Sequence, residues 1–93
     1  MQVADEQSYE EVIHSLQSYI GEVARSAGDM RSAGTDCVDN TLNDPAAVKS
    51  NERLQSAISK IESAVADIRG VIKDLQDELE EIREAAEAAN SAD

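Results

Sequence analysis

His14 is the only histidine in the chain, so any chemistry that needs an imidazole must use it. A metal site or an acid–base site built on His14 would need a second histidine or a cysteine at ligand spacing. Its nearest titratable neighbours are the carboxylates of Glu10 and Glu11. The sequence therefore predicts a partly exposed surface histidine, without a metal or catalytic role.

Cys37 is the only cysteine, which excludes an internal disulfide. No basic residue stands beside it to stabilise a thiolate, so we expect a small buried hydrophobe near the middle of the chain. The acid-rich segment from Asp36 to Asp44 lacks the glycine and the distal glutamate of an EF-hand loop. The roles of Cys37 and of this segment stay open.

Carboxylates are abundant, but pairs such as Asp77 and Glu81 fall on one polar helical face. Acid–base catalysis needs carboxyl groups whose burial differs, held in a cleft. The sequence also lacks a glycine-rich phosphate loop. We therefore predict a protein that is not an enzyme and that has no catalytic, cofactor-binding or metal-binding residues.

The charge balance narrows the class of partner. Twenty acidic residues stand against eight basic ones among 93 residues, which gives a net charge of −12. Nucleic-acid binding and adhesion to anionic membranes both start from a basic surface, so neither is expected. The apolar runs are too short for a membrane span. Met1 to Glu6 lacks the basic and apolar regions of a Sec signal peptide, so we expect synthesis in the cytoplasm without that signal.

Two apolar stripes, each with steps that alternate between four and three residues, run along the chain. This spacing is typical of packed helices. The first stripe consists of Tyr9, Ile13, Leu16, Ile20, Val23, Ala27, Met30, Gly34 and Cys37. The second consists of Leu54, Ile58, Ile61, Val65, Ile68, Ile72, Leu75, Leu79, Ile82, Ala86 and Ala89.

Signals for the starts and ends of helices predict that residues 1–93 form a single helical hairpin. Ser8 and Glu11 have the spacing of a capping box, and Asn43, Asp44 and Pro45 suit the start of a helix. We predict an all-α fold with helices at about 8–39 and 45–88, a turn at about 40–44 and a frayed acidic tail. Gly34 could instead end the first helix.

Folding the chain about Asp44 places the two stripes against each other. Gly34 then meets Leu54, and Ile20 meets Ile68. Since only Tyr9 and Tyr19 are aromatic, the resulting core is a thin seam. Apolar residues beside each stripe make both faces wider than one seam needs, which predicts a dimer, as a four-helix bundle of two hairpins. The predicted interface residues are Val12, Leu16, Tyr19, Ile20, Val23, Ala64, Ile68, Val71, Ile72, Leu75, Leu79 and Ile82.

Two long amphipathic helices, a central turn, acidic charge and an Ala-rich acidic tail resemble the small WxG-type (Esx-like) helical hairpins of bacterial type VII secretion. They also resemble the small helical partners of LXG-domain toxins. The segment from Cys37 to Leu42 stands where that family has Trp-x-Gly, and no tyrosine follows Tyr19 to form a Tyr-x-x-x-Asp/Glu export motif. The resemblance implies a divergent member that is exported or that pairs with a larger secreted effector.

Two other functions fit the residues. One is a structural subunit of a helical secretion filament, although the high negative charge opposes close stacking. The other is a cytosolic acidic regulator that binds a basic protein, which predicts an affinity that falls steeply with salt. The partner is expected to be the chain itself, a related helical hairpin or a larger effector.

Overall fold

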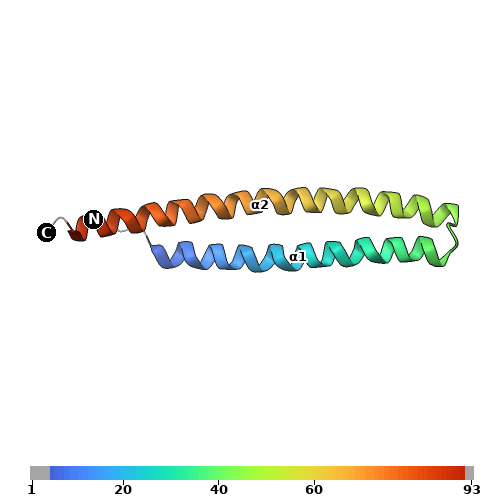
Figure 1. The fold of residues 1–93 in the computed structure, drawn as a ribbon, viewed down its shortest axis with the longest axis horizontal. Helices are drawn as coiled ribbons and strands as arrows, with labels where there is room; N and C mark the ends of the chain where they lie inside the picture. Colours follow the sequence, from blue (N-terminus) through green and yellow to red (C-terminus); the bar gives the residue numbers. More distant parts are fainter. Residues whose placement is uncertain (1–4, 92–93) are drawn as a thin grey trace.

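The computed structural model describes residues 5–91, which form two antiparallel helices joined by a short turn (Figure 1). Helix α1 spans Glu6–Asn40 and helix α2 spans Pro45–Ser91. The all-α hairpin predicted from the sequence is confirmed, and the described residues contain no strand. The molecule is a rod with extents of 74 × 18 × 15 Å, so its core is a single line of contacts between two helices.

Asp5, rather than Ser8, caps the start of α1. The amide of Ser8 donates to Asp5 Oδ1 at 3.3 Å, and its hydroxyl donates to Asp5 Oδ2 at 2.6 Å. The predicted capping box at Ser8 is wrong, because Asp5 already supplies an acceptor three residues earlier and the helix begins at Glu6. The two hydrogen bonds from Ser8 lower the pKa of the Asp5 carboxyl, and the bond from the Ser8 side chain has the larger effect.

A Schellman motif ends α1 after Asn40. The amide of Asn43 donates to the carbonyl of Val38 at 2.9 Å, and the amide of Leu42 donates to that of Asp39 at 3.2 Å. Leu42 occupies the left-handed position of this motif, with φ of 53°, where glycine is usual. Its side chain is 89% exposed, so no burial offsets the strained backbone.

Of the two candidate caps, Asn43 and Asp44, it is Asp44 that caps α2, since its Oδ2 accepts from the amides of Ala46 and Ala47 at 3.2 and 3.3 Å. Pro45 is the first residue of the helix, where its missing N–H leaves no hydrogen bond unmade. Helix α1 runs through Gly34 without interruption, so the alternative in which Gly34 ended it does not occur.

The seam between the helices buries one residue in every seven on each side. These residues are Ile13, Ile20, Ala27 and Gly34 on α1, and Ile58, Val65, Ile72 and Leu79 on α2. Partly buried residues fill the positions between them. On α2 the seam follows the predicted alternation of four and three from Leu54 to Ile82.

On α1 the seam changes course after Ile20. Its half-buried members there are Ala24, Arg31 and Val38, whereas the predicted Val23, Met30 and Cys37 are exposed. The prediction failed because an α-helix has 3.6 residues per turn and drifts by about 20° per heptad relative to a strict seven-residue repeat. Cys37 therefore lies beside the seam and is not a buried hydrophobe.

Helix α2 extends beyond the start of α1, as Figure 1 shows at its red end. Ile82 is half-buried, and residues 83–91 continue the helix with exposed side chains up to Ser91. Residues 1–4 and 92–93, which include most of the segment compared with a signal peptide and the last residues of the tail, lie outside the described part of the chain.

Candidate helix-binding face

The hydrogen bonds and ion pairs between the two helices lie along one side of the hairpin, here called the polar face. Near the turn, Arg31 of α1 donates to Gln55 and Glu62 of α2. At the open end, Arg83 of α2 pairs with Glu6 and Glu10 of α1. Such ties fix which residues of the two helices lie opposite each other.

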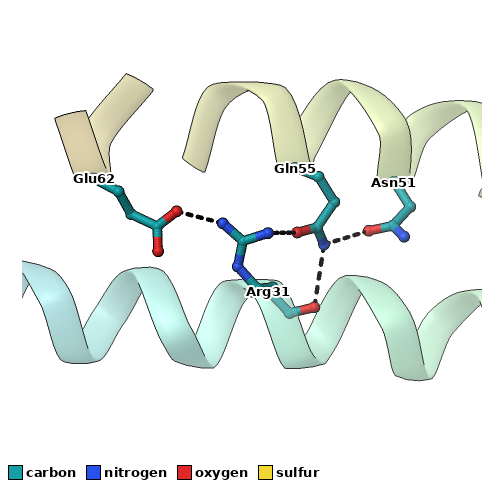
Figure 2. A network of polar contacts seen from close by, with 4 residues as sticks. All are labelled: Arg31, Asn51, Gln55 and Glu62. Atoms are coloured by element: carbon teal, nitrogen blue, oxygen red, sulfur yellow. Dashed lines mark hydrogen bonds and ion pairs between the residues drawn. The ribbon is translucent and has the colours of Figure 1, made fainter. Parts of the chain in front are cut away.

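The network around Arg31 is drawn in Figure 2. The Arg31 guanidinium donates to Gln55 Oε1 at 2.6 Å, and Gln55 Nε2 donates to the Arg31 carbonyl and to Asn51 Oδ1 at 3.3 and 2.9 Å (Figure 2). The Arg31 and Glu62 side chains are 41% and 53% exposed, so their ion pair is worth less than about 1 kcal/mol. The network therefore specifies alignment more than it adds stability.

Gly34 lets α2 approach closely beside this network. A Cβ atom at this position would overlap Asn51 Oδ1 and lie 2.9 Å from Leu54 Cδ2. A Cβ added at Gly21, Gly28 or Gly70 would meet nothing within 4 Å, so the requirement for glycine is particular to Gly34. The contact with Leu54 also confirms the predicted pairing of Gly34 with Leu54.

A row of mostly apolar and mostly exposed side chains lies on α1 beside the seam. Tyr19 is 67% exposed, Val23 41% and Met30 38%, although each would bury apolar area against a partner. The whole row has steps of four and three residues, which is the spacing of a second seam. We call this row the outer stripe of α1; it consists of Val12, Leu16, Tyr19, Val23, Ser26, Met30, Ala33 and Cys37.

Helix α2 carries a matching row, which includes the 49% exposed Val71. The outer stripe of α2 consists of Leu54, Ala57, Ile61, Ala64, Ile68, Val71 and Leu75, and Ile82 follows after the exposed Glu78, which interrupts the apolar row. Ala57, Ala64 and Val71 are exposed, whereas the larger members are half-buried because they also reach into the seam. One side of α2 therefore offers both a seam and a rim of uncovered apolar atoms.

The two outer stripes lie on the same side of the hairpin. Near the turn, Ala33 and Cys37 from α1 line one shallow hollow together with Ala46, Ser50 and Leu54 from α2. On the opposite side, which carries the hydrogen bonds and ion pairs between the helices, Gln17 and Gly21 line a hollow with Arg69. The stripes together form what we call the apolar face.

The twelve residues predicted as the interface fall into two groups. Ile20, Ile72 and Leu79 are buried in the seam, and Leu16, Ile68, Leu75 and Ile82 are half-buried at its edge. The others, all exposed on the apolar face, are Val12, Tyr19, Val23, Ala64 and Val71. Met30 and Cys37 also belong to this face, and the drift of the heptad pattern was the signal that could have placed them there.

The residues considered for chemistry are separated in the fold. His14 lies on α1 beside a hollow lined also by Glu10, Gln17 and Arg83, and Cys37 lies near the turn. Within residues 5–91, no group of three or more His, Cys, Asp or Glu side chains is placed to hold a metal ion. In the same range, neither helix has a stretch long and apolar enough to cross a membrane.

Comparison of the chain with protein-family models, with curated proteins and with solved structures finds no match in any of the three. The candidate site therefore rests on the geometry of the hairpin.

Proposed function

We propose that this chain is a non-enzymatic protein that binds other helices through its apolar face. The observation that carries the proposal is the pair of outer stripes, whose exposed and half-buried apolar residues repeat the spacing of the seam inside the hairpin. Surface residues of this kind are scattered singly in ordinary monomers, whereas here they gather along one side of the hairpin on both helices.

The large accessible surface of the chain supports the proposal that a partner covers part of it. Its accessible surface is 6991 Å², whereas a compact monomer of 10.0 kDa exposes about 5,200 Å². The surplus of about 1,800 Å² exceeds the roughly 800 Å² that one protein contributes to an interface of standard size. One docked helical hairpin would therefore bring the chain closer to an ordinary ratio of surface to mass.

The biological setting that we propose is bacterial type VII secretion, with the chain as a substrate or as the targeting or chaperone partner of a larger secreted effector. The hairpin architecture and the acidic Ala-rich end of α2 support this setting. The end of α1, where Cys37 to Leu42 replaces Trp-x-Gly, favours a partner that carries the export signal in place of this chain.

Binding of helices can be tested with two variants that each add one negative charge. Tyr19→Glu places the charge on the apolar face, and Gln17→Glu places it on the polar face at the same level of the rod. Each variant is co-expressed with the proteins encoded beside its gene, and the masses of the complexes are measured by light scattering. We expect Tyr19→Glu to lose complexes that Gln17→Glu retains, and equal behaviour of the two would contradict binding through the apolar face.

The setting has a separate test. Dependence of the protein, or of its bound effector, on the secretion ATPase for appearance in the culture medium would support the type VII proposal. Retention in the cell without a bound effector would refute it. An affinity for basic proteins that falls steeply with salt would instead favour the acidic regulator, and filaments that grow with protein concentration would favour the structural subunit.

A further inference from the structure

We infer that the part of α1 nearest the turn, from Gly21 to Asn40, has a second packing, in which it rotates about its own axis and exchanges the residues that face α2. The residues that leave the seam are the half-buried Ala24, Arg31 and Val38. The residues that replace them are the exposed Val23, Met30 and Cys37. We call this second packing the rotated state. Its consequence for binding rests on the proposed function, because the rotated state withdraws part of the apolar face.

The rotation that exchanges the two sets is small. Ile20, Ala27 and Gly34 keep their place in the seam in both packings, and each is followed by a member of one set after three residues and of the other after four. A strict seven-residue repeat departs from a straight α-helix by about 20° per heptad, so the two heptads from Ile20 to Gly34 accumulate about 40°. A gentle left-handed supercoil of this part of α1 is therefore enough to reach the rotated state.

The residues around which α1 turns are small. Ala27 is 1% exposed and Gly34 is buried, and these two residues stay in the seam near the turn. Toward the open end, the equivalent residues are Ile13 and Ile20, which pack into the aliphatic cluster. Large side chains that interdigitate resist rotation, whereas alanine and glycine have nothing to carry across the seam. The part of α1 near the turn can therefore rotate while the open end stays fixed.

The structure has room for the incoming residues. A shallow hollow lies between the helices near the turn, and Cys37 lines it together with Ala46, Ala47 and Ser50 of α2. Because these three residues of α2 are small, rotation carries the Cys37 side chain into the hollow. It also covers the apolar atoms of Val23 and Met30, which are 41% and 38% exposed. The rotated state therefore gains buried apolar area.

The Arg31 network holds the packing that the structure shows. The Arg31 guanidinium donates to Gln55 Oε1 at 2.6 Å and to Glu62, and both contacts need Arg31 on the side of α1 that faces α2. Rotation breaks these contacts. It strands no polar group, because the side chains of Arg31, Gln55 and Glu62 are all partly exposed and water can replace the lost hydrogen bonds. The two packings thus exchange hydrogen bonds for buried apolar area.

The exchange controls how much of the apolar face is open to a partner. Val23 and Met30 belong to the outer stripe of α1, so their entry into the seam removes them from the surface that a helix would contact. A partner that binds the apolar face therefore selects the packing of the structure over the rotated state. The Arg31 network, although it lies on the polar face, keeps the opposite face ready for binding.

Thiol labelling of the isolated chain tests the exchange. Cys37 is exposed, so a maleimide should label it quickly. Val38→Cys in a Cys37→Ser background places the thiol one residue further, in the seam, where labelling should be slower. Arg31→Ala removes the network and should slow the labelling of Cys37 and quicken that of Val38→Cys, each by about three-fold or more. Arg25→Ala, which removes an exposed arginine from the same helix, is the matched control and should change neither rate.

Opposite changes in the two rates are specific to rotation. Fraying or unfolding of α1 near the turn would quicken the labelling of both thiols, and circular dichroism of each variant measures any loss of helix. If Arg31→Ala quickens both rates, or changes neither, the second packing is overturned.

Binding separates this inference from the proposed function. Arg31→Ala should weaken the binding of a helical partner by about the factor by which it slows the labelling of Cys37, because both depend on the fraction of chains in the packing of the structure. Rates that exchange in a chain that binds no helical protein overturn the proposed function and leave the second packing standing. Loss of a partner through Tyr19→Glu, without an exchange of rates in Arg31→Ala, overturns the second packing alone.

Discussion

Toward the open end of the hairpin, the seam is made of large aliphatic side chains, with Ile13, Ile20, Val65, Ile72 and Leu79 in one buried cluster. Toward the turn, α1 contributes small and polar residues, where the Arg31 network crosses between the helices beside Gly34, while α2 still contributes large ones such as the fully buried Ile58. Buried apolar area stabilises both halves, whereas the Arg31 network and the close approach at Gly34, which align the helices, lie in the second. The comparison separates what holds the hairpin together from what sets its register.

The largest expected effect is in the open half. Ile72→Ala removes a side chain that is only 5% exposed in the aliphatic cluster, and it should lower the free energy of unfolding by about 2–4 kcal/mol. Gln55→Ala in the turn half removes exposed or half-buried hydrogen bonds and should cost less, about 1 kcal/mol. Urea unfolding followed by circular dichroism measures both. A larger loss for Gln55→Ala would reverse the comparison.

Two glycine substitutions sharpen the assignment of close approach to the turn half. Gly28→Ala gains helix propensity in open space and should stabilise the protein by about 1 kcal/mol. Gly34→Ala makes the same gain, but its Cβ overlaps Asn51 and crowds Leu54, an overpacking cost of about 1–3 kcal/mol. The two variants should therefore differ in unfolding free energy by about that amount. Equal stabilisation of both, in thermal unfolding, would show that the helices separate without cost at Gly34.

Leu42 extends the comparison to the turn itself. Leu42→Gly relieves a left-handed backbone at a side chain that is 89% exposed, so it should stabilise the hairpin by about 1 kcal/mol. Asn43, with φ of 60°, is a useful control, because asparagine tolerates this conformation and Asn43→Gly should gain less. Thermal unfolding of the two variants measures the difference. A loss of stability in Leu42→Gly would mean that Leu42 makes an apolar contact in solution.

Sequence reasoning found the seam of α2 more completely than the seam of α1. The aliphatic residues from Leu54 to Leu79 have one strong periodic pattern, and the structure follows it. On α1, the pattern through Val23, Met30 and Cys37 was equally regular, yet these residues belong to the outer stripe. Two apolar stripes lie side by side on α1, and a strict seven-residue spacing does not show which of them faces α2. The drift of a straight helix relative to that spacing would have shown it. The position of Arg31 in the seam follows from a hydrogen-bonded network that spans both helices, which a linear pattern does not contain.

The local ends of the helices show a similar limit. At the start of α2, Pro45 indicated where the helix begins, but Asn43 and Asp44 were both candidate caps. At the start of α1, the side chains of Asp5 and Ser8 can both act as an N-cap. Which of them does so depends on whether the helix begins one turn earlier, as it does here. The width of the apolar face was predictable from the flanking residues, whereas its gathering on one side required the geometry of the packed pair.

The smallest expected effect concerns the pH dependence of that N-cap. The hydrogen bonds from Ser8 lower the pKa of Asp5, so the folded helix favours the carboxylate. The stabilisation is therefore present above the ordinary pKa of an aspartate and is lost as the pH falls through the lowered value. Amide hydrogen exchange in the first turn of α1 should quicken, relative to the middle of the helix, over that acidic range. Asp5→Asn keeps an acceptor that does not titrate, so its first turn should lack this pH dependence, and an unchanged profile in the variant would exclude Asp5 as its source. Because the open end of the seam is stabilised by the aliphatic cluster, loss of the cap should fray the first turn and leave the packing of Ile13 against α2 intact.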